Sequence, residues 1–276
     1  MRTTEARRAT AAARAVASSL GLAAEDATVL NDSNKLTLRL RPCDVLARVA
    51  PPTDRSAPFE LRVAGALAAA GCPVAVPDPR VEPRAYERDG FTVTLWTYHE
   101  PVAPHGALAP ADYADALHRL HAGSRGVHIP VPHFTERIAV ARELVANRIE
   151  TPALADGDRE LLADTLESTA RAIDVRAAPE QPLHGEPHPG NLLATVDGPL
   201  LIDLETVCRG PVEFDLAHAP EEVAAHYPGA DASLLRECRL LVLAIITTWR
   251  HDRRDQLPDG RRLGEEWLTR IRTART

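Results

Sequence analysis

The stretch HGEPHPGNLLATVDGPLLIDLE, residues 184–205, decides the fold. Two short apolar runs within it flank the dipeptide Asp197-Gly198. A two-residue Asp-Gly loop between apolar runs predicts a β-hairpin. Because the two strands of a hairpin run antiparallel, Asn191 at the start of the first strand is expected to lie close to Asp203, which follows the second.

The polar side chains around this predicted hairpin are those that phosphoryl transfer needs. Such a reaction uses metal ions across the phosphates, a carboxylate that orients the attacking hydroxyl, and cations that hold negative charge. Glu186 supplies a carboxylate just before the hairpin. Asn191 and Asp203 supply an amide oxygen and a carboxylate oxygen, which are ligands that suit Mg²⁺. The stretch therefore predicts magnesium-assisted phosphoryl transfer.

A zinc hydrolase is the main rival interpretation of the same residues. His184, Glu186 and His188 are of the types that bind or serve zinc. Zinc proteases of this kind, however, place two histidines four residues apart on a helix. Pro187 and Pro189 exclude a helix here, because proline removes a backbone donor and clashes with the preceding turn. We therefore favour the magnesium interpretation.

The segment resembles the catalytic loop HGDxHxGN of aminoglycoside phosphotransferases and their choline-kinase-like relatives. The loop residues that match are His184, Gly185, His188, Gly190 and Asn191. The family's continuation, IDxE followed by G-P and DLA, is matched by Ile202–Glu205, Gly210-Pro211 and Asp215–Ala217. The resemblance implies that Asn191 and Asp203 hold magnesium and take part in catalysis. It also implies structural support from His184, His188 and Asp215.

One position departs from the family pattern. The family's catalytic aspartate is Glu186 in this chain. Glutamate keeps the carboxylate but moves it by about 1.5 Å, one carbon–carbon bond further along the side chain. Three interpretations follow: Glu186 acts as the base in a slightly widened site, the reaction is slow and depends on positioning and metals, or catalysis has been lost.

The flanking sequence predicts an α+β chain with the bilobal layout of protein kinases. Leu36, Leu38 and Leu40 alternate with polar residues, as in a half-buried strand. Further strands are expected at 45–49 and 91–98, and a helix at 59–70. Beyond residue 110 the pattern is helical apart from the hairpin, with helices expected at 110–122, 134–148, 158–173, 233–251 and 260–272. We expect a β-rich N-lobe over 1–98, a hinge over 99–109, and a mainly helical C-lobe with a small catalytic hairpin over 110–276.

The resemblance places a nucleotide in the N-lobe. Arg48 stands on the predicted third strand, where kinases carry a lysine, and Glu60 begins the next helix as its expected partner. Arginine binds phosphate and carboxylate through a bidentate fork, although it is not interchangeable with lysine. The alternative is a surface arginine and a glutamate favoured by the helix dipole. Ser33 and Lys35 lie at the expected phosphate-covering turn, and Trp96 and Tyr98 at the expected adenine-binding hinge.

Composition narrows the class of protein further. The chain has 276 residues and a net charge of −7, which is the opposite of the basic footprint of a nucleic-acid binder. Its longest apolar run is far below the roughly 20 residues that span a bilayer, so we expect no membrane partner and a cytoplasmic location. The four cysteines are widely scattered, which predicts free thiols rather than a metal site. Either a monomer or a homodimer fits these observations.

The function expected from the resemblance is that of a small-molecule kinase. ATP or GTP would donate the γ-phosphate, with Mg²⁺, to a hydroxyl of an antibiotic, sugar, nucleoside or similar metabolite, in antibiotic resistance or natural-product biosynthesis. The C-terminal segment mixes many arginines with acids and does not resemble a site for a polycation. The alternative is a kinase-like module that binds nucleotide or ligand with impaired catalysis.

Overall fold

The computed structural model describes residues 3–104 and 106–275. These residues form two compact units. Unit 1 contains the described residues up to Ile129 together with Gly190–Thr206, and unit 2 contains Pro130–Pro189 together with the described residues from Val207 onward. The chain therefore leaves unit 2 after Pro189, completes unit 1, and returns to unit 2 at Val207.

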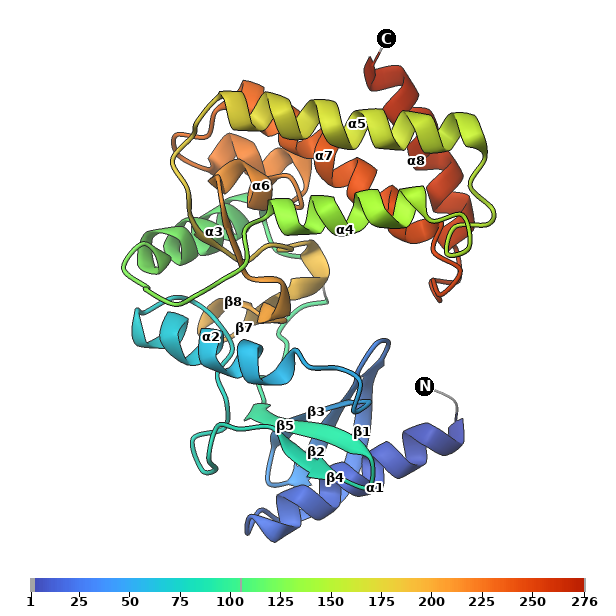
Figure 1. Cartoon of the computed structure of the whole chain (residues 1–276). Coiled ribbons are helices and arrows are strands. Elements are labelled where there is room, and N and C mark those ends of the chain that lie inside the picture. Colours follow the sequence, from blue (N-terminus) through green and yellow to red (C-terminus); the bar gives the residue numbers. More distant parts are fainter. Residues whose placement is uncertain (1–2, 105, 276) are drawn as a thin grey trace. The chain divides into compact units, whose positions relative to one another are not determined.

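Unit 1 contains a five-stranded antiparallel sheet (Figure 1). Its strand order is β1-β2-β3-β5-β4. The bounds are β1 Ala24–Asp32, β2 Leu36–Pro42, β3 Val45–Ala50, β4 Tyr86–Arg88 and β5 Phe91–Thr97. Leu36, Leu38 and Leu40 are completely buried, so the alternation predicted from the sequence is confirmed.

One face of this sheet packs against the first helix, α1 (Thr3–Ser19). The contact depends on small side chains at helical spacing, which are buried against the strands: Ala9, Ala12, Ala13, Val16 and Ala17. An apolar stripe repeating every three to four residues is what a surface helix needs to bury one face. Helix α1 is therefore amphipathic, with its apolar stripe against the sheet.

The remaining elements of unit 1 include the predicted hairpin and the segment that follows it. They are α2 (Ala57–Ala69), α3 (Pro110–Ser124), β7 (Leu192–Thr195), β8 (Gly198–Leu201) and η2 (Leu204–Thr206). Strands β7 and β8 pair antiparallel, with Thr195 opposite Gly198, so the predicted hairpin is confirmed. Its two-residue loop is Val196-Asp197, one residue earlier than predicted, because Gly198 already belongs to β8. Backbone hydrogen bonds from Ala75 to Leu201 and from Val102 to Ala194, each 2.9 Å long, join this hairpin to the N-terminal part of the chain.

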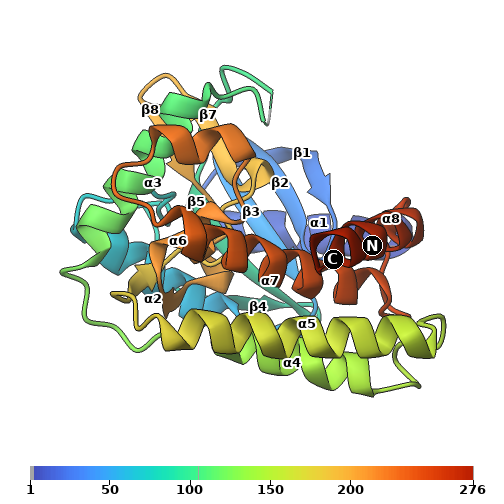
Figure 2. The same ribbon diagram turned by 90° about the horizontal axis from the view of Figure 1, so that it is seen from above.

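Unit 2 is mainly helical. Its elements are α4 (Thr135–Ala146), α5 (Asp156–Val175), β6 (Gln181–Leu183), β9 (Cys208–Gly210), α6 (Val212–Leu216), η3 (Glu221–His226), α7 (Ala232–Arg250) and α8 (Gly260–Arg275), with η1 (Pro189–Asn191) at its junction with unit 1. Helices α4 and α5 run side by side, and α7 packs against both (Figure 2). The core between these helices includes Phe134, Leu162, Leu166, Phe214 and Leu241.

The observed elements differ from the predicted ones in two respects. Strands β4, β6 and β9 were not predicted, because three residues are too few to display an alternating pattern. The compact units also do not follow the predicted lobes: α3 and the β7–β8 hairpin belong to unit 1, since they pack with α2 and with each other. The predicted roles of the lobes stay predictions.

Two further expectations concern the whole chain. The α+β class with a β-rich N-terminal part and a helical C-terminal part is confirmed. The cysteines form no disulfide: Cys72, Cys208 and Cys238 are buried free thiols, and Cys43 is half-buried. Over the described part of the chain, every helix is too short or too polar to cross a bilayer.

Candidate functional site

Asp215 holds the loop that carries Glu186 by its backbone. The two carboxylate oxygens of Asp215 accept hydrogen bonds from the backbone N–H groups of His184 and Gly185, both at 2.8 Å. Both Asp215 and His184 are fully buried. Gly185 has φ = +87°, a conformation that glycine adopts without strain. The backbone of the loop is therefore held by a buried carboxylate.

Arg137, in the first turn of α4, holds the side chain of Glu186. Its Nη2 donates to Glu186 Oε2 at 3.1 Å, and its Nη1 donates to the carbonyl oxygen of Gly185 at 2.8 Å. The backbone N–H of His188 donates to the carbonyl oxygen of Glu186 at 2.8 Å, which closes a tight turn; the His188 side chain is exposed. Arg137 thus fixes both the loop and its carboxylate.

The charge of Arg137 also sets the ionisation of its neighbours. Burial by itself would raise the pKa of Glu186, but Arg137 outweighs it, with help from His218 and His188, and the pKa lies below its ordinary value. Burial and Arg137 lower the pKa of His218 to about 4. The Nε2 atom of His218 is buried and has no hydrogen-bond partner among the described residues. At neutral pH, Glu186 is therefore ionised and His218 is neutral.

The β7–β8 hairpin of unit 1 places Asn191 beside the segment that carries Asp203. The backbone N–H of Ile202 donates to the carbonyl oxygen of Asn191 at 3.0 Å. Asp203 itself has φ = +64°, a left-handed conformation that is uncommon outside glycine, asparagine and aspartate. Such local strain is found where a side chain must be aimed in one direction. The expected proximity of residues 191 and 203 is present in the backbone.

Arg48 joins β3 to both α2 and the end of the hairpin. Its Nη1 donates to Glu60 Oε1, and its Nη2 donates to Asp203 Oδ1 at 2.7 Å. Glu60 is buried in the first turn of α2. The structure therefore pairs the arginine and the glutamate that the sequence matched, and it adds Asp203 to the pair.

Lys35, the only lysine of the chain, lies in the same group of charges. Its ammonium group donates to Glu205 and, at 2.8 Å, to Ser56 Oγ. It also lies 3.6 Å from Asp54 and 3.7 Å from Glu60. Only 7% of Lys35 is exposed, so this is a buried cation held by several acids rather than a solvated surface lysine. We call this group the unit 1 cluster; it comprises Lys35, Arg48, Asp54, Ser56, Glu60, Asp203 and Glu205.

The pKa values in the unit 1 cluster reflect burial and mutual attraction. Burial would lower the pKa of Arg48, but the carboxylates of Glu60 and Asp203 reverse this and raise it. Burial raises the pKa of Glu60, against the effects of Arg48 and Lys35. Acids outnumber cations in the cluster, so it carries excess negative charge when all its groups are ionised.

The excess of oxygen ligands fits a divalent cation. Glu60, Asp203 and Glu205 each offer one carboxylate oxygen, and these three atoms lie within 4.8 Å of one another. All are hard oxygen donors of the kind that Mg²⁺ prefers. The backbone of Asn191 is hydrogen-bonded to residue 202, next to Asp203. The donor set thus matches the cation that the resemblance implies.

The side chains of three other predicted nucleotide-binding residues contact partners outside the unit 1 cluster. Ser33 Oγ accepts from Asn31 in the β1–β2 turn. Trp96 is buried, and its indole N–H donates to Thr94 at 2.8 Å. The Tyr98 hydroxyl accepts from Arg39, whose guanidinium lies 4.1 Å from the centre of the tyrosine ring. The side chains of Trp96 and Tyr98 are thus engaged in the fold, and the backbone of Trp96 is paired with Leu46 within the sheet.

Sequence reasoning missed several members of the site. Arg137 and His218 were not singled out, because each reaches the loop through tertiary contacts that leave no local pattern. Glu205 was quoted within its motif but was given no role. The sequence offered one indication of the unit 1 cluster: its only lysine, Lys35, stands at the predicted phosphate-covering turn, where its positive charge needs a partner.

Comparisons with known proteins agree with this geometry. The sequence profile of the phosphotransferase enzyme family matches residues 26–237. No curated protein matches the chain. Amicoumacin kinase in complex with AMP-PNP, Ca²⁺ and Ami aligns with a TM-score of 0.71 at 12% identity, over 99% of this chain and 96% of that one.

Two other solved structures are similar to a comparable extent. A choline/ethanolamine kinase family protein from Mesorhizobium loti has a TM-score of 0.69 at 19% identity, over 99% of this chain and 95% of that one. The GDP complex of aminoglycoside 2'-phosphotransferase-IIIa has a TM-score of 0.69 at 15% identity, over 95% of this chain and 97% of that one. At these identities the likeness shows a common fold.

Proposed function

The chain belongs to the phosphotransferase enzyme family, and from this premise we propose that it transfers the γ-phosphate of ATP or GTP to a hydroxyl group of a small molecule. The observation that carries the proposal is the unit 1 cluster. One buried cation, Lys35, one half-buried cation, Arg48, and an excess of carboxylates are gathered at one place from four separate parts of the chain. Phosphoryl transfer needs cations for the phosphates and carboxylates for the metal.

Arg48 and Lys35 are the proposed phosphate ligands. In the structure both cations are paired with carboxylates. A bound triphosphate brings negative charge of its own, and it would compete with those carboxylates for the two cations. Ser33, in the neighbouring turn, would cover the phosphates, and the backbone at Trp96 and Tyr98 would hold the base.

Asn191 and Asp203 are the proposed magnesium ligands, and Glu205 is an adjacent third donor. When bound, the metal neutralises charge on the phosphates and aligns the transferred group. The contribution of the protein is to hold the two donors together through the hairpin hydrogen bond between residues 191 and 202. The left-handed backbone at Asp203 fixes the direction of its carboxylate.

Glu186 is the proposed base for the acceptor hydroxyl. Its lowered pKa keeps it ionised at neutral pH, which is the form that accepts a proton or a hydrogen bond. Arg137 holds this carboxylate in one orientation, so the additional methylene relative to aspartate does not leave it free to rotate. His184 and Asp215 support the loop from below.

The proposed acceptor is a neutral or modestly charged hydroxyl compound such as an antibiotic, a sugar or a nucleoside. The arginines of the C-terminal helices are paired with nearby acids: Arg250 with Asp255, Arg254 with Asp252, Arg261 with Glu265 and Arg262 with Glu266. Glu213 is buried and accepts from the backbone of Asp231. The acids beside the C-terminal arginines are thus engaged in ion pairs, which favours an acceptor other than a polycation.

The test is phosphate transfer from γ-labelled ATP and GTP, with Mg²⁺, to a panel of hydroxyl compounds. We expect Asp203→Asn to abolish transfer, and Glu186→Asp to preserve or raise it. The matched control is Asp197→Asn, which removes an exposed acid from the turn of the same hairpin. Equal activity of Asp203→Asn and Asp197→Asn would refute the assignment of the metal site.

A binding module without turnover is the second candidate. Two observations favour it: Glu186 replaces the family's aspartate and is already paired with Arg137, and Asp203 is already paired with Arg48. Such a module would bind nucleotide through the unit 1 cluster. It would transfer no phosphate to an acceptor or to water. Nucleotide binding by calorimetry, measured beside the transfer assay, separates the two candidates.

A further inference from the structure

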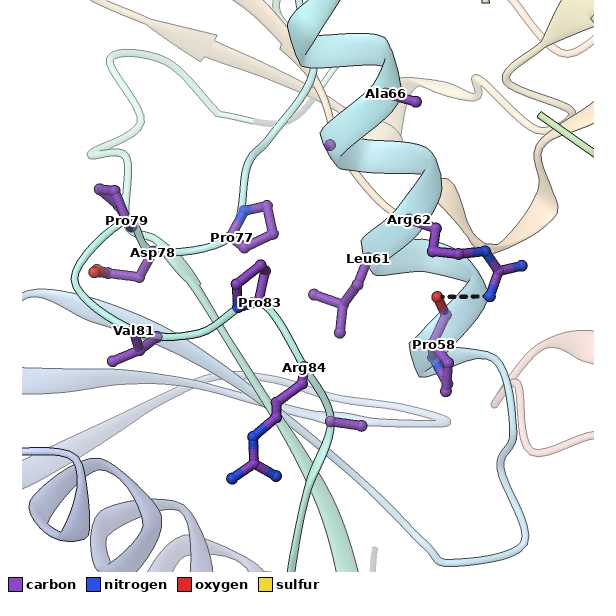
Figure 3. A pocket seen from close by; sticks show the side chains of 12 residues that line it. Pro58, Leu61, Arg62, Ala66, Pro77, Asp78, Pro79, Val81, Pro83 and Arg84 are labelled. Carbon is purple, nitrogen blue, oxygen red and sulfur yellow. Dashed lines mark hydrogen bonds between the residues drawn. The ribbon is translucent and has the colours of Figure 1, made fainter. Parts of the chain in front are cut away.

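A groove of about 830 Å³ lies in unit 1 between one face of α2 and the segment from Pro77 to Ala85 (Figure 3). Leu61 of α2 faces Pro77 and Pro83 across it (Figure 3). None of the proposed phosphate or metal ligands lines this groove. Glu60 is the neighbour of Leu61 in sequence, but its carboxylate is turned to Arg48 and Lys35.

The walls of the groove are apolar and largely preformed. On the α2 side they include Pro58, Leu61 and Ala66, and on the other side Pro77, Pro79, Val81 and Pro83. Proline fixes its own backbone angle φ, so a wall rich in proline loses little conformational freedom when a ligand binds. Small-molecule sites are concave and mostly apolar, with a few polar groups for orientation.

Gly65 keeps the groove open at the middle of α2. Its φ is not positive, so the backbone does not require glycine. A Cβ atom built there would meet nothing within 4 Å, so crowding does not require glycine either. Glycine in the interior of a helix is less favourable than any residue but proline. The missing side chain leaves space in the groove, and no packing role in the structure accounts for it.

The charged groups at the groove differ in whether they have a partner of opposite charge. The buried carboxylate of Asp78 is taken by Arg80, at 2.6 and 2.9 Å. Arg84 shares its charge with Glu82 at 3.0 Å. These groups are therefore neutralised within the fold.

Arg62 differs from them. Arg62 lines the groove from α2, with its guanidinium directed away from Pro77 and Pro83, and it donates to the carbonyl oxygen of Pro58 at 3.2 Å (Figure 3). Its guanidinium also lies 5.9 Å from the centre of the Phe59 ring. No carboxylate lies within 4.0 Å of it among the residues that the structure describes. An exposed, flexible guanidinium with only these neutral partners exchanges them readily for an anion. The whole chain carries a net charge of −7. A positive charge without an acidic partner therefore distinguishes this groove from most of the protein surface.

We propose that this groove binds a small apolar molecule that carries one anionic group, a carboxylate or sulfonate, with its body against the proline wall and Gly65 and its charge at Arg62. The inference does not depend on the proposed kinase reaction. It concerns a second site on the helix that also supplies Glu60.

The experiment uses two fluorescent probes that share an aromatic body and differ in charge. They are 1-anilinonaphthalene-8-sulfonate, an anion, and N-phenyl-1-naphthylamine, its neutral counterpart. We expect Gly65→Leu to weaken both probes by at least about tenfold, because leucine fills the groove. We expect Arg62→Gln to weaken only the anion, by about two- to fivefold, as an exposed ion pair predicts.

Matched controls show whether the effect belongs to the groove. Gly157→Leu alters an exposed glycine of α5 whose Cβ would also meet nothing within 4 Å, and Arg7→Gln alters an exposed arginine of α1. Neither should change probe affinity. Leucine favours a helix over glycine, so Gly65→Leu should raise Tm, and a loss of binding with a raised Tm cannot come from unfolding.

Saturating MgATP completes the design, since it should leave probe affinity unchanged. Displacement of the anion by MgATP would place the probe in the nucleotide site and overturn the proposal. So would unchanged binding by Gly65→Leu, an equal loss in Gly157→Leu, or an effect of Arg62→Gln that is the same for both probes.

Discussion

In the unit 1 cluster two cations share four carboxylates, whereas in unit 2 the carboxylate of Glu186 is paired with Arg137. The first arrangement has negative charge to spare and can accept a metal, and its cations can exchange carboxylates for phosphates. The second is balanced, and it fixes one carboxylate in one direction. The comparison teaches that the same pairing of acids with arginines can prepare a binding site in one unit and an oriented base in the other.

Arg48→Met should have the largest effect on stability, because it leaves Glu60 buried without its nearest cation. Breaking a buried pair costs about 3–5 kcal/mol, and we expect the lower end because Lys35 remains 3.7 Å from Glu60. Urea unfolding measures it. Arg41→Met removes an exposed pair with Asp26 and should cost less than about 1 kcal/mol. Equal losses in the two variants would show that burial adds nothing to the cluster.

Asp215→Ala should follow, with a loss of about 2–4 kcal/mol in unit 2. The substitution leaves the buried backbone N–H groups of His184 and Gly185 without their acceptor. Asp215→Asn keeps one acceptor oxygen and should fall between the parent and the alanine variant. An asparagine variant as unstable as the alanine variant would mean that charge, rather than hydrogen bonding, holds the loop.

His218 should make unit 2 sensitive to acid. Its pKa is about 4 in the folded chain and 6.5 ordinarily, so the unfolded chain binds the proton more readily. The contribution of neutral His218 to stability is therefore complete above pH 6.5 and is lost as the pH falls towards 4, by at most about 3 kcal/mol. His218→Phe should flatten the stability profile over this window. His128→Phe, which changes an exposed histidine, should leave the slope of the parent.

Arg137→Met should produce the smallest and most specific change, a shift in the pH profile of transfer. Arg137 lowers the pKa of Glu186, and only the ionised carboxylate acts as a base. Removing the arginine raises that pKa, so the acid limb of kcat/KM should move to higher pH. A variant with reduced activity but an unmoved limb would show that Arg137 orients the loop without affecting the base.

Local patterns were enough to predict the main strands and the hairpin. The pair Asp197-Gly198 marks the hairpin turn to within one residue, and the leucines of β2 show their buried face by alternation. Both signals arise from backbone geometry that is set within a few residues. The predicted helices match the observed ones to within a few residues at each end, for the same reason.

The composition of the site could not be predicted in this way. Arg137 is 49 residues from Glu186, and Lys35 is 170 residues from Glu205. Contacts of this range depend on packing of the whole chain and leave no spacing to recognise. The pairing of Arg48 with Glu60 was predictable only through the resemblance, because eleven intervening residues of strand, loop and helix do not by themselves specify an ion pair.

Because unit 1 includes Gly190–Thr206, its N-terminal part is synthesised well before its last segment. Arg48 leaves the ribosome 155 residues ahead of Asp203, a delay of roughly 8–30 s at ordinary rates of translation. During that time Lys35 and Arg48 must be hydrated or satisfied by Asp54 and Glu60 alone. The N-terminal sheet therefore forms while two of the four carboxylates of the cluster, those of Asp203 and Glu205, are still absent. Slower translation between codons 60 and 203 would lengthen the time for which the incomplete unit is exposed to proteases and chaperones.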